Sequence, residues 1–184
     1  MGGRLKTPLM TIGICSRDQA PEILAIFNHE IAHSTSIYEH ALRTSGFMRG
    51  WFDTKERDGL PVLGAFAEDG SLAGFATYGA FRAFPAYGKT VEHSIYVRED
   101  RRGQGIGRAL LDELKRTARL RDLHVMVGVI DAANAASVEL HRSAGFVHAG
   151  TLREVGYKFG RWLDVELYQF NLAVPGGSTG KPVT

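Results

Sequence analysis

Six consecutive residues, three of them glycine, form the most informative stretch of this 184-residue chain. The stretch Arg102-Gly103-Gln104-Gly105-Ile106-Gly107 joins a strand-like run at residues 90–97 to a helix-like run at residues 108–119. Glycines leave the backbone uncovered, so successive N–H groups can turn toward one ligand. At the start of a helix, such a group of donors is suited to an anion. The loop therefore predicts a ligand that carries phosphate.

The spacing of this loop separates it from two common phosphate loops. A P-loop requires Lys and then Ser or Thr after its last glycine, whereas Arg108 follows here. A dinucleotide loop requires G-x-G-x-x-G and an acidic residue about 20 positions later. Here the third glycine comes one residue early, and Asp122 follows no clear second strand. The remaining pattern is Arg/Gln-x-x-Gly-x-Gly/Ala, filled by Arg102, Gly105 and Gly107. A plain tight turn is the alternative.

A second polar set lies further along the chain. Asn134, Ser137 and His141 stand at i, i+3 and i+7, so on a helix they share one face. The set comes just after the strand that follows the glycine loop, and it leads into Ala144-Gly145-Phe146. This position favours a binding role. The alternative is a solvent-exposed polar stripe in which Asn134 caps the helix.

The elements that would position these groups follow from changes in the hydrophobic period. Strands are expected at residues 11–15, 62–67, 72–78, 90–97, 125–130, 146–152 and 163–172, and helices at residues 19–29, 44–55, 108–119 and 134–144. The second and third strands form a hairpin around Asp69-Gly70. This order predicts an α/β fold with a single mixed sheet flanked by helices.

Length and composition point to one ordinary globular domain. The chain is 44% hydrophobic and 23% charged, and its net charge of +2 gives no nucleic-acid footprint. We expect a domain at residues 10–173, preceded by an extension at residues 1–9 and followed by a flexible tail at residues 174–184.

Cysteine and hydropathy patterns restrict the class of protein further. Cys15 is the single cysteine, so an internal disulfide and a cysteine-based metal cluster are excluded. The seven histidines show no close ligand spacing, and we expect no metal. No apolar run approaches the roughly 18 residues that span a bilayer, and no signal-peptide core is present. We therefore expect no membrane partner and a cytoplasmic protein.

The order of loop, helix, strand and Asn-x-x-Ser-x-x-Leu-His-x-x-x-Gly-Phe resembles the GCN5-related N-acetyltransferases (GNAT), which bind acetyl-coenzyme A. Residues 90–97, 134–141 and 156–164 are similar to the phosphinothricin and methionine sulfoximine acetyltransferase branch. The resemblance covers residues 12–172. It implies the GNAT fold, whose sheet is mostly antiparallel, an acetyl-CoA co-substrate and a homodimer.

The resemblance also assigns residues to the coenzyme. The backbone of three strand residues would pair with the pantetheine arm, and the Val97 N–H would polarise the thioester carbonyl as an oxyanion hole does. The loop amides would hold the pyrophosphate, and Asn134 would bond the pantetheine with Ser137 nearby. The expected coenzyme-binding residues are Ile95, Tyr96, Val97, Arg102, Gly103, Gln104, Gly105, Ile106, Gly107, Arg108, Asn134 and Ser137.

Two residues are expected to carry the chemistry. An amine must lose its proton before it attacks a thioester, and a nearby carboxylate removes that proton. Glu92, on the strand before the loop, matches the residue assigned as general base in this branch; a surface glutamate is the alternative. His141 stands where many relatives have Tyr, although this branch commonly has His. It would protonate the leaving thiolate, or else only contact coenzyme A or the core.

A small amino-acid-like substrate also needs its carboxylate held. Arg82 is the best local candidate, because a guanidinium binds a carboxylate with two hydrogen bonds. Relatives often have Arg where this chain has Gly88, which removes one expected contact. Tyr38 lines the pocket or packs in the core. The expected substrate-binding residues are Arg82, Phe84, Tyr87, Tyr38, Lys158 and Arg161, the last two across a dimer interface as the resemblance implies.

These assignments predict an N-acetyltransferase that moves acetyl from acetyl-CoA to the α-amine of a small amino-acid analogue, such as methionine sulfoximine, methionine sulfone or phosphinothricin. The amine would attack directly in a ternary complex. The alternatives are acetylation of a protein N-terminus, a lysine or an aminoglycoside, and a non-catalytic sensor that binds coenzyme A. The short aromatic segment at residues 81–87 favours a small closed pocket over a polypeptide groove.

Overall fold

The computed structural model describes residues 10–173, so the extension and the tail expected at the two ends lie outside the described residues. The strands are β1 (Thr11–Ile14), β2 (Val62–Phe66), β3 (Leu72–Ala80), β4 (Thr90–Val97), β5 (Val125–Asp131), β6 (Val147–Lys158) and β7 (Arg161–Asn171). The helices are α1 (Ala20–His33), α2 (Ser45–Arg57), α3 (Ile106–Leu120) and α4 (Ala135–Ser143), with short 3₁₀ turns at Arg17–Gln19, Pro85–Tyr87 and Glu99–Arg101.

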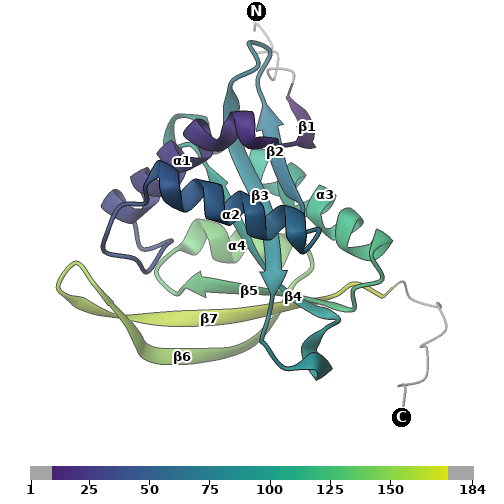
Figure 1. Ribbon diagram of the computed structural model, residues 1–184. Helices are drawn as coiled ribbons and strands as arrows, with labels where there is room; N and C mark the ends of the chain where they lie inside the picture. The colour runs from purple at the N-terminus through teal and green to yellow at the C-terminus, as the bar shows by residue number, and fades with distance from the viewer. Residues whose placement is uncertain (1–9, 174–184) are drawn as a thin grey trace, which may run out of the picture.

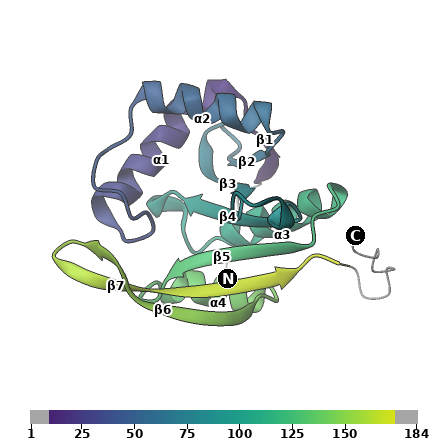
Figure 2. The same ribbon diagram turned by 60° about the horizontal axis from the view of Figure 1, so that its bottom comes forward.

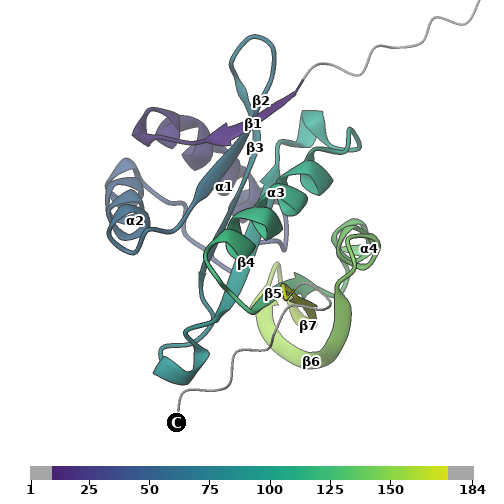
Figure 3. The same cartoon turned by 90° about the vertical axis from the view of Figure 1, so that its right-hand side faces the viewer.

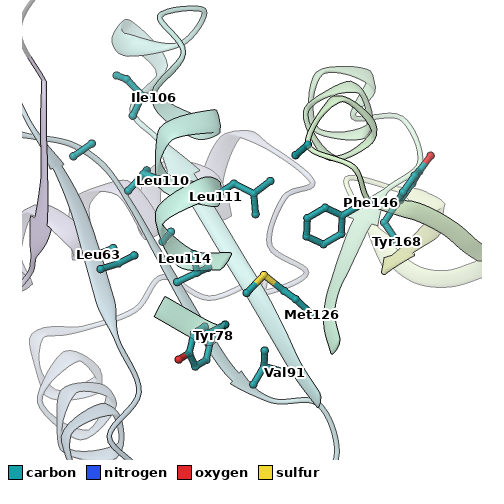
Figure 4. Close-up of a cluster of buried hydrophobic side chains, with 14 of the residues drawn as sticks. Leu63, Tyr78, Val91, Ile106, Leu110, Leu111, Leu114, Met126, Phe146 and Tyr168 are labelled. Atoms are coloured by element: carbon teal, nitrogen blue, oxygen red, sulfur yellow. The ribbon is translucent and has the colours of Figure 1, made fainter. Parts of the chain in front are cut away.

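Helices cover both faces of one sheet. Figure 3 shows α1 and α2 on one side of strands β1 to β4, and α3 on the other. Each face of the sheet has its own hydrophobic core, because the helices on that face present an apolar stripe to the sheet. On the α3 side, Leu110, Leu111 and Leu114 are fully buried and point at the sheet, with Phe146 and Tyr168 nearby (Figure 4). On the other side, Phe27 of α1 packs against Phe75 of β3.

The seven strands form one sheet in the order β1-β2-β3-β4-β5-β7-β6. Every neighbouring pair is antiparallel except β4 and β5, which run parallel. That one parallel pair is short: it joins Thr90 to Val125, Val91 to Met126 and Glu92 to Val127, and it stops there. Beyond Glu92 the two strands diverge, which opens the sheet between them.

The hairpin of β6 and β7 is longer than the sequence predicted. The two strands run to Lys158 and from Arg161, whereas strands were expected only at residues 146–152 and 163–172. The register shifts between Leu152 and Gly156, and Glu154 has a φ of 53°, so the side-chain alternation is interrupted inside β6. A sequence search for strict alternation misses such a strand. The hairpin sweeps under the rest of the fold, and its tip lies near the loop after α1 (Figures 1 and 2).

Candidate active site

The glycine loop at the start of α3 presents a run of bare backbone donors. Gly103 and Gly105 have φ angles of 73° and 79°, a conformation that side chains disfavour. Within residues 10–173, no group accepts a hydrogen bond from the N–H of any residue from 103 to 108. The first donor inside α3 is Ala109, which bonds the Gly105 carbonyl at 3.1 Å. These free amides at a helix N-terminus suit a phosphate group, as the sequence predicted.

The two arginines at the ends of the loop, Arg102 and Arg108, form hydrogen bonds and ion pairs within the protein. The Arg102 N–H bonds the Glu99 carbonyl at 3.3 Å, so the free run begins one residue later than predicted. The Arg102 guanidinium bonds the Val97 carbonyl at 3.2 Å and pairs with the buried carboxylate of Glu30 on α1. Arg108 bonds Asp112 at 2.7 Å and the carbonyl of Ser143, at the end of α4, at 3.0 Å. Both side chains fasten the loop to neighbouring helices.

A cleft of about 450 Å³ runs from this loop into the gap between β4 and β5. Its walls are residues 93–97 of β4 and 128–131 of β5, with the first residues of α3 and the polar face of α4 around them. The two motifs that the sequence singled out, Arg102 to Gly107 and Asn134 to His141, thus line one cavity although they are 27 or more residues apart. The cleft narrows toward Glu92 and Val127, where the strands join.

The direction of the β4 backbone decides which of its groups reach the cleft. The Arg98 N–H bonds the Ala73 carbonyl of β3 at 2.9 Å, and N–H groups alternate along a strand. The N–H groups of Ile95 and Val97 therefore face β5, across the open gap. The Tyr96 backbone faces β3 instead, and the Tyr96 ring packs on Phe27 at 5.4 Å between ring centres. Of the three predicted backbone contacts, the geometry favours Ile95 and Val97.

The polar face of α4 forms another wall. Asn134 caps the helix, because its side-chain oxygen accepts from the Ser137 N–H at 3.0 Å. The capping alternative therefore holds, and Asn134 still lines the cleft together with Ser137. His141 is not on a solvent-exposed stripe: it is 4% exposed, and its ring packs on Phe146 at 5.1 Å between ring centres.

His141 has a hydrogen-bond partner, His93, that the sequence analysis missed. Its Nε2 lies 2.8 Å from Nε2 of His93 on β4. Nδ1 of His93 lies 2.7 Å from the Val127 carbonyl, and Nδ1 of His141 lies 2.6 Å from the Ser137 carbonyl. Burial lowers the pKa of both rings, and for His93 burial together with the charge of His141 lowers it to about 3. The available signal was a histidine on the otherwise apolar face of β4.

Glu92 lies at the narrow end of the gap, on the face of β4 opposite His93. Burial raises the pKa of Glu92 above its usual value, and the positive charge of Arg82 partly opposes that shift. The Arg82 guanidinium lies 4.0 Å from the Glu92 carboxylate, and both side chains remain partly exposed. A half-buried carboxylate with a raised pKa, next to a cleft, has the properties of a general base.

Comparison with known proteins supports this reading of the cleft. Residues 23–146 match the acetyltransferase (GNAT) family. The chain belongs to this family. It is 46% identical over 152 residues to L-methionine sulfoximine/L-methionine sulfone acetyltransferase of Pseudomonas aeruginosa, across 83% of this chain and 88% of that protein. It is 38% identical over 174 residues to phosphinothricin N-acetyltransferase of Alcaligenes faecalis, across 92% and 86% of the two chains.

A solved relative gives the same result in three dimensions. The phosphinothricin acetyltransferase of Sinorhizobium meliloti, in complex with acetyl-CoA, superposes with a TM-score of 0.86 at 33% identity, over 88% of each chain. The predicted family and branch, the mixed and mostly antiparallel fold and the acetyltransferase activity are therefore confirmed.

The aromatic residues expected around the acetyltransferase's substrate lie in two different settings. Phe84, just before the 3₁₀ turn Pro85–Tyr87, and Tyr87 within it are both exposed, and Tyr87 packs on Phe81. Tyr38, in the loop after α1, donates from its hydroxyl to the Asp131 carboxylate at 2.9 Å. Because Asp131 lines the cleft, this bond holds Tyr38 at the cleft's edge. Burial and the bond to Asp131 raise the pKa of Tyr38, so its hydroxyl stays protonated.

The two basic residues of the β6–β7 hairpin differ from each other. The Lys158 ammonium is buried and donates to the carbonyls of Ser34 and Ile37 at 2.7 Å each. It therefore holds the hairpin against the loop after α1 and does not line the cleft. Arg161 is exposed beside it at the hairpin tip. Lys158 thus has a structural role within the chain, and the substrate contact expected for it across a dimer interface stays a prediction.

Membrane and metal features can be assessed within the same residues. No helix in the range 10–173 has the length and apolarity to cross a bilayer. Nor does that range contain a group of three or more residues suited to hold a metal ion.

Proposed function

We propose that this acetyltransferase moves the acetyl group of acetyl-CoA to the α-amine of a small amino-acid analogue of the methionine sulfoximine, methionine sulfone or phosphinothricin type. One observation carries the proposal: a single cleft runs from the free amides of residues 103–108 to the point where β4 and β5 join, and Glu92 belongs to the last residue pair of that junction. The printed names of the relatives support the substrate class.

The residues at the mouth fit acetyl-CoA, which supplies the acetyl thioester when bound. Six consecutive amides without internal partners match the several oxygens of a pyrophosphate. The Val97 N–H faces the gap while its carbonyl is bonded to Arg102, so only the donor is free. A donor there would stabilise negative charge on a thioester oxygen.

Glu92 and Arg82 would act together on the amine substrate. In our proposal Arg82 holds the α-carboxylate, and Glu92 takes the proton from the α-ammonium, directly or through water. The freed amine attacks the thioester carbon, the C–N bond forms and the C–S bond breaks, and the second proton of the nitrogen passes to the leaving sulfur, which gives the amide and free coenzyme A. Cys15, the one cysteine, is buried in the other core, so direct attack is favoured over an acetyl-cysteine route.

We also propose a cytoplasmic homodimer. Support comes from the β6–β7 hairpin, which exposes several large apolar side chains; the exposed residues are Leu152, Val155, Tyr157, Phe159 and Trp162. Exposed large apolar side chains gathered on one hairpin are a common feature of subunit contacts. Light scattering of the purified protein should give twice the chain mass, and Trp162→Glu should give the monomer mass. If the wild-type protein had the mass of one chain, the dimer proposal would be wrong, whereas the acetyltransferase proposal would be unaffected.

The function is tested by following thiol release from acetyl-CoA across a panel of amines. We expect kcat/KM to be highest for methionine sulfoximine, methionine sulfone and phosphinothricin, and low for peptide N-termini, lysine and aminoglycosides. Preference for a peptide or an aminoglycoside would overturn the substrate class. Tight coenzyme A binding with no turnover on any amine would favour a sensor and overturn the enzyme proposal.

A further inference from the structure

The closed end of the cleft contains two buried imidazoles whose four ring nitrogens all have a partner. Nε2 of His93 and Nε2 of His141 face each other at 2.8 Å. The two Nδ1 atoms lie 2.7 Å and 2.6 Å from the main-chain carbonyls of Val127 and Ser137. No other hydrogen bond to either ring occurs among the described residues. The hydrogens of the pair can therefore be counted.

Counting the hydrogens on the four ring nitrogens gives the charge of the pair. A carbonyl oxygen only accepts hydrogen bonds, so both Nδ1 atoms must carry hydrogen. A neutral imidazole carries one N–H, and two neutral rings would then leave a lone pair on each Nε2. Those lone pairs would face each other at 2.8 Å, which is repulsive at hydrogen-bond distance. One additional proton between the two Nε2 atoms converts the contact into a hydrogen bond.

We infer that His93 and His141 share one proton between their Nε2 atoms, and that this pair is a fixed buried cation at the closed end of the cleft. The catalytic part of this inference rests on the proposed function, because the charge would act on acetyl transfer. His93 is then a positioning residue that keeps the proton on His141.

The groups around the two rings are compatible with a total of one positive charge on the pair, but not with a charge on each ring. From β5 and α4, the carbonyls of Val127 and Ser137 point their negative ends at the rings. Aromatic rings also flank the pair: between ring centres, Phe146 lies 5.1–5.4 Å from the two imidazoles, and the titratable Tyr168 of β7 lies 6.4 Å from His141. Burial lowers the pKa of both rings and so opposes charge on either, but two neutral rings would leave lone pairs facing each other at 2.8 Å, and we take this geometry to decide for one proton. The low pKa of His93 beside charged His141 excludes a second.

Strand β5 has a glycine, Gly128, where the two rings pack against it. A Cβ atom on Gly128 of β5 would lie 2.9 Å from Cε1 of His93 and 3.1 Å from Cδ2 of His141. Any side chain at position 128 would therefore displace both rings. Gly128 and both histidines line the cleft, and Gly128 and His93 each come one residue beyond the last pair of β4 and β5.

Such a charge would serve acetyl transfer without giving up its proton. Attack on the thioester places negative charge on the carbonyl oxygen, and breaking the C–S bond places it on sulfur. A cation held in a buried site stabilises both, because it needs no rearrangement during the reaction. The first proton of the ammonium goes to Glu92, the second passes from the attacking nitrogen to the leaving sulfur, and the shared proton stays between the rings. This differs from the donor role expected for His141, since no N–H of that ring is free to reach sulfur.

The proton can be observed directly in the wild-type protein without ligand. Long-range ¹H–¹⁵N correlation spectra report whether each imidazole nitrogen carries hydrogen. At pH 7 we expect three hydrogens over the four nitrogens of the pair, with spectra of His93→Gln and His141→Gln giving the assignments. Two hydrogens over four nitrogens would overturn the inference. Exposed His124 serves as the internal reference for an ordinary ring.

Two substitutions of His93 separate a charge from simple packing. His93→Phe fills the space but accepts no hydrogen bond, whereas His93→Gln keeps an acceptor for the proton of His141. We expect kcat to fall about 100-fold in the Phe variant and less in the Gln variant, with the Kd of acetyl-CoA unchanged in both. If packing were the only role, Phe would retain more activity than Gln, and the inference would be wrong. His124→Gln is the matched control and should keep wild-type kcat.

The two ways of failing are distinguishable. If the spectra show two neutral rings while the wild type acetylates methionine sulfoximine, the shared proton is wrong and the proposed function stands. If the spectra show the shared proton but no amine is acetylated, the proposed function is wrong and the charged pair stands.

Discussion

The two ends of the cleft differ in whether their polar groups already have partners within the protein. At the mouth, residues 103–108 offer backbone N–H groups that have no partner within the described chain. At the closed end, every nitrogen of His93 and His141 is already bonded within the protein. An end with free donors gains its interactions from the ligand, whereas an end with satisfied groups is organised before the ligand arrives.

This difference separates affinity from chemistry. Free amides at a helix start recognise any group with phosphate-like oxygens, so they should set the affinity for acetyl-CoA. Side chains fixed by long-range contacts should set the rate, because stabilisation that is present before reaction lowers the barrier. Changes at the closed end should therefore alter kcat, and changes at the mouth should alter Kd.

The largest expected effect is at the closed end. Glu92→Gln keeps the size of the side chain but removes the base, so kcat should fall by about 10²–10⁴-fold. Stopped-flow or steady-state thiol release measures the fall, and calorimetry should give a Kd for acetyl-CoA close to the wild-type value. Normal turnover of this variant at neutral pH would remove Glu92 from the role and blur the contrast between the two ends.

At the mouth, Gly105→Val should weaken acetyl-CoA binding by about 10-fold or more. Valine at a φ of 79° is strained by about 1–3 kcal/mol, and relief of that strain would turn the amides away from the ligand. Saturating acetyl-CoA should restore most of kcat. Gly70→Val is the matched control: Gly70 has a φ of 80° in the β2–β3 turn, so it carries similar strain without lying at the cleft. A normal Kd in Gly105→Val would contradict the assignment of the mouth.

A smaller effect tests the electrostatics around the base. The Arg82 charge lowers the pKa of Glu92, so Arg82→Met should raise that pKa further. Because the base works only when ionised, the acid limb of the kcat–pH profile should move to higher pH, by less than about one unit. Rates well above the limb should change little at saturating substrate. Lys89→Met, which removes a charge paired with Asp122, should leave the limb in place. A shift to lower pH in Arg82→Met would reverse the proposed interaction.

The smallest effect distinguishes two roles of one residue. Asn134→Ala should lower the free energy of unfolding by about 1 kcal/mol, because the cap on α4 is lost. Thermal denaturation would show a decrease in Tm of about 2–4 °C. Asn134→Ser restores a capping oxygen but not the amide N–H₂ group. If Ser recovers Tm but not acetyl-CoA affinity, Asn134 also contacts the coenzyme; full recovery of both would limit it to capping.

Most of the fold was predictable because each element has its own local pattern. The strand at β4 was predicted with its observed ends, and α3 was recognised from a clear 3.6-residue period. The β6–β7 hairpin was underestimated because its register shifts break the alternation. The site was predicted as far as its motifs, but His93, Gly128 and Asp131 were not foreseen, since their roles depend on neighbours from other strands.

The sequence alone determined the free amides at the mouth, because glycine spacing and a helix start fix backbone directions within a few residues. The tertiary structure decided the rest. His93 and His141 are 48 residues apart, and Arg102 reaches Glu30 across 72 residues. The histidine pair lies where β4 and β5, after running parallel for three pairs, diverge. Strand register and divergence follow from packing of the whole sheet, which no local pattern specifies.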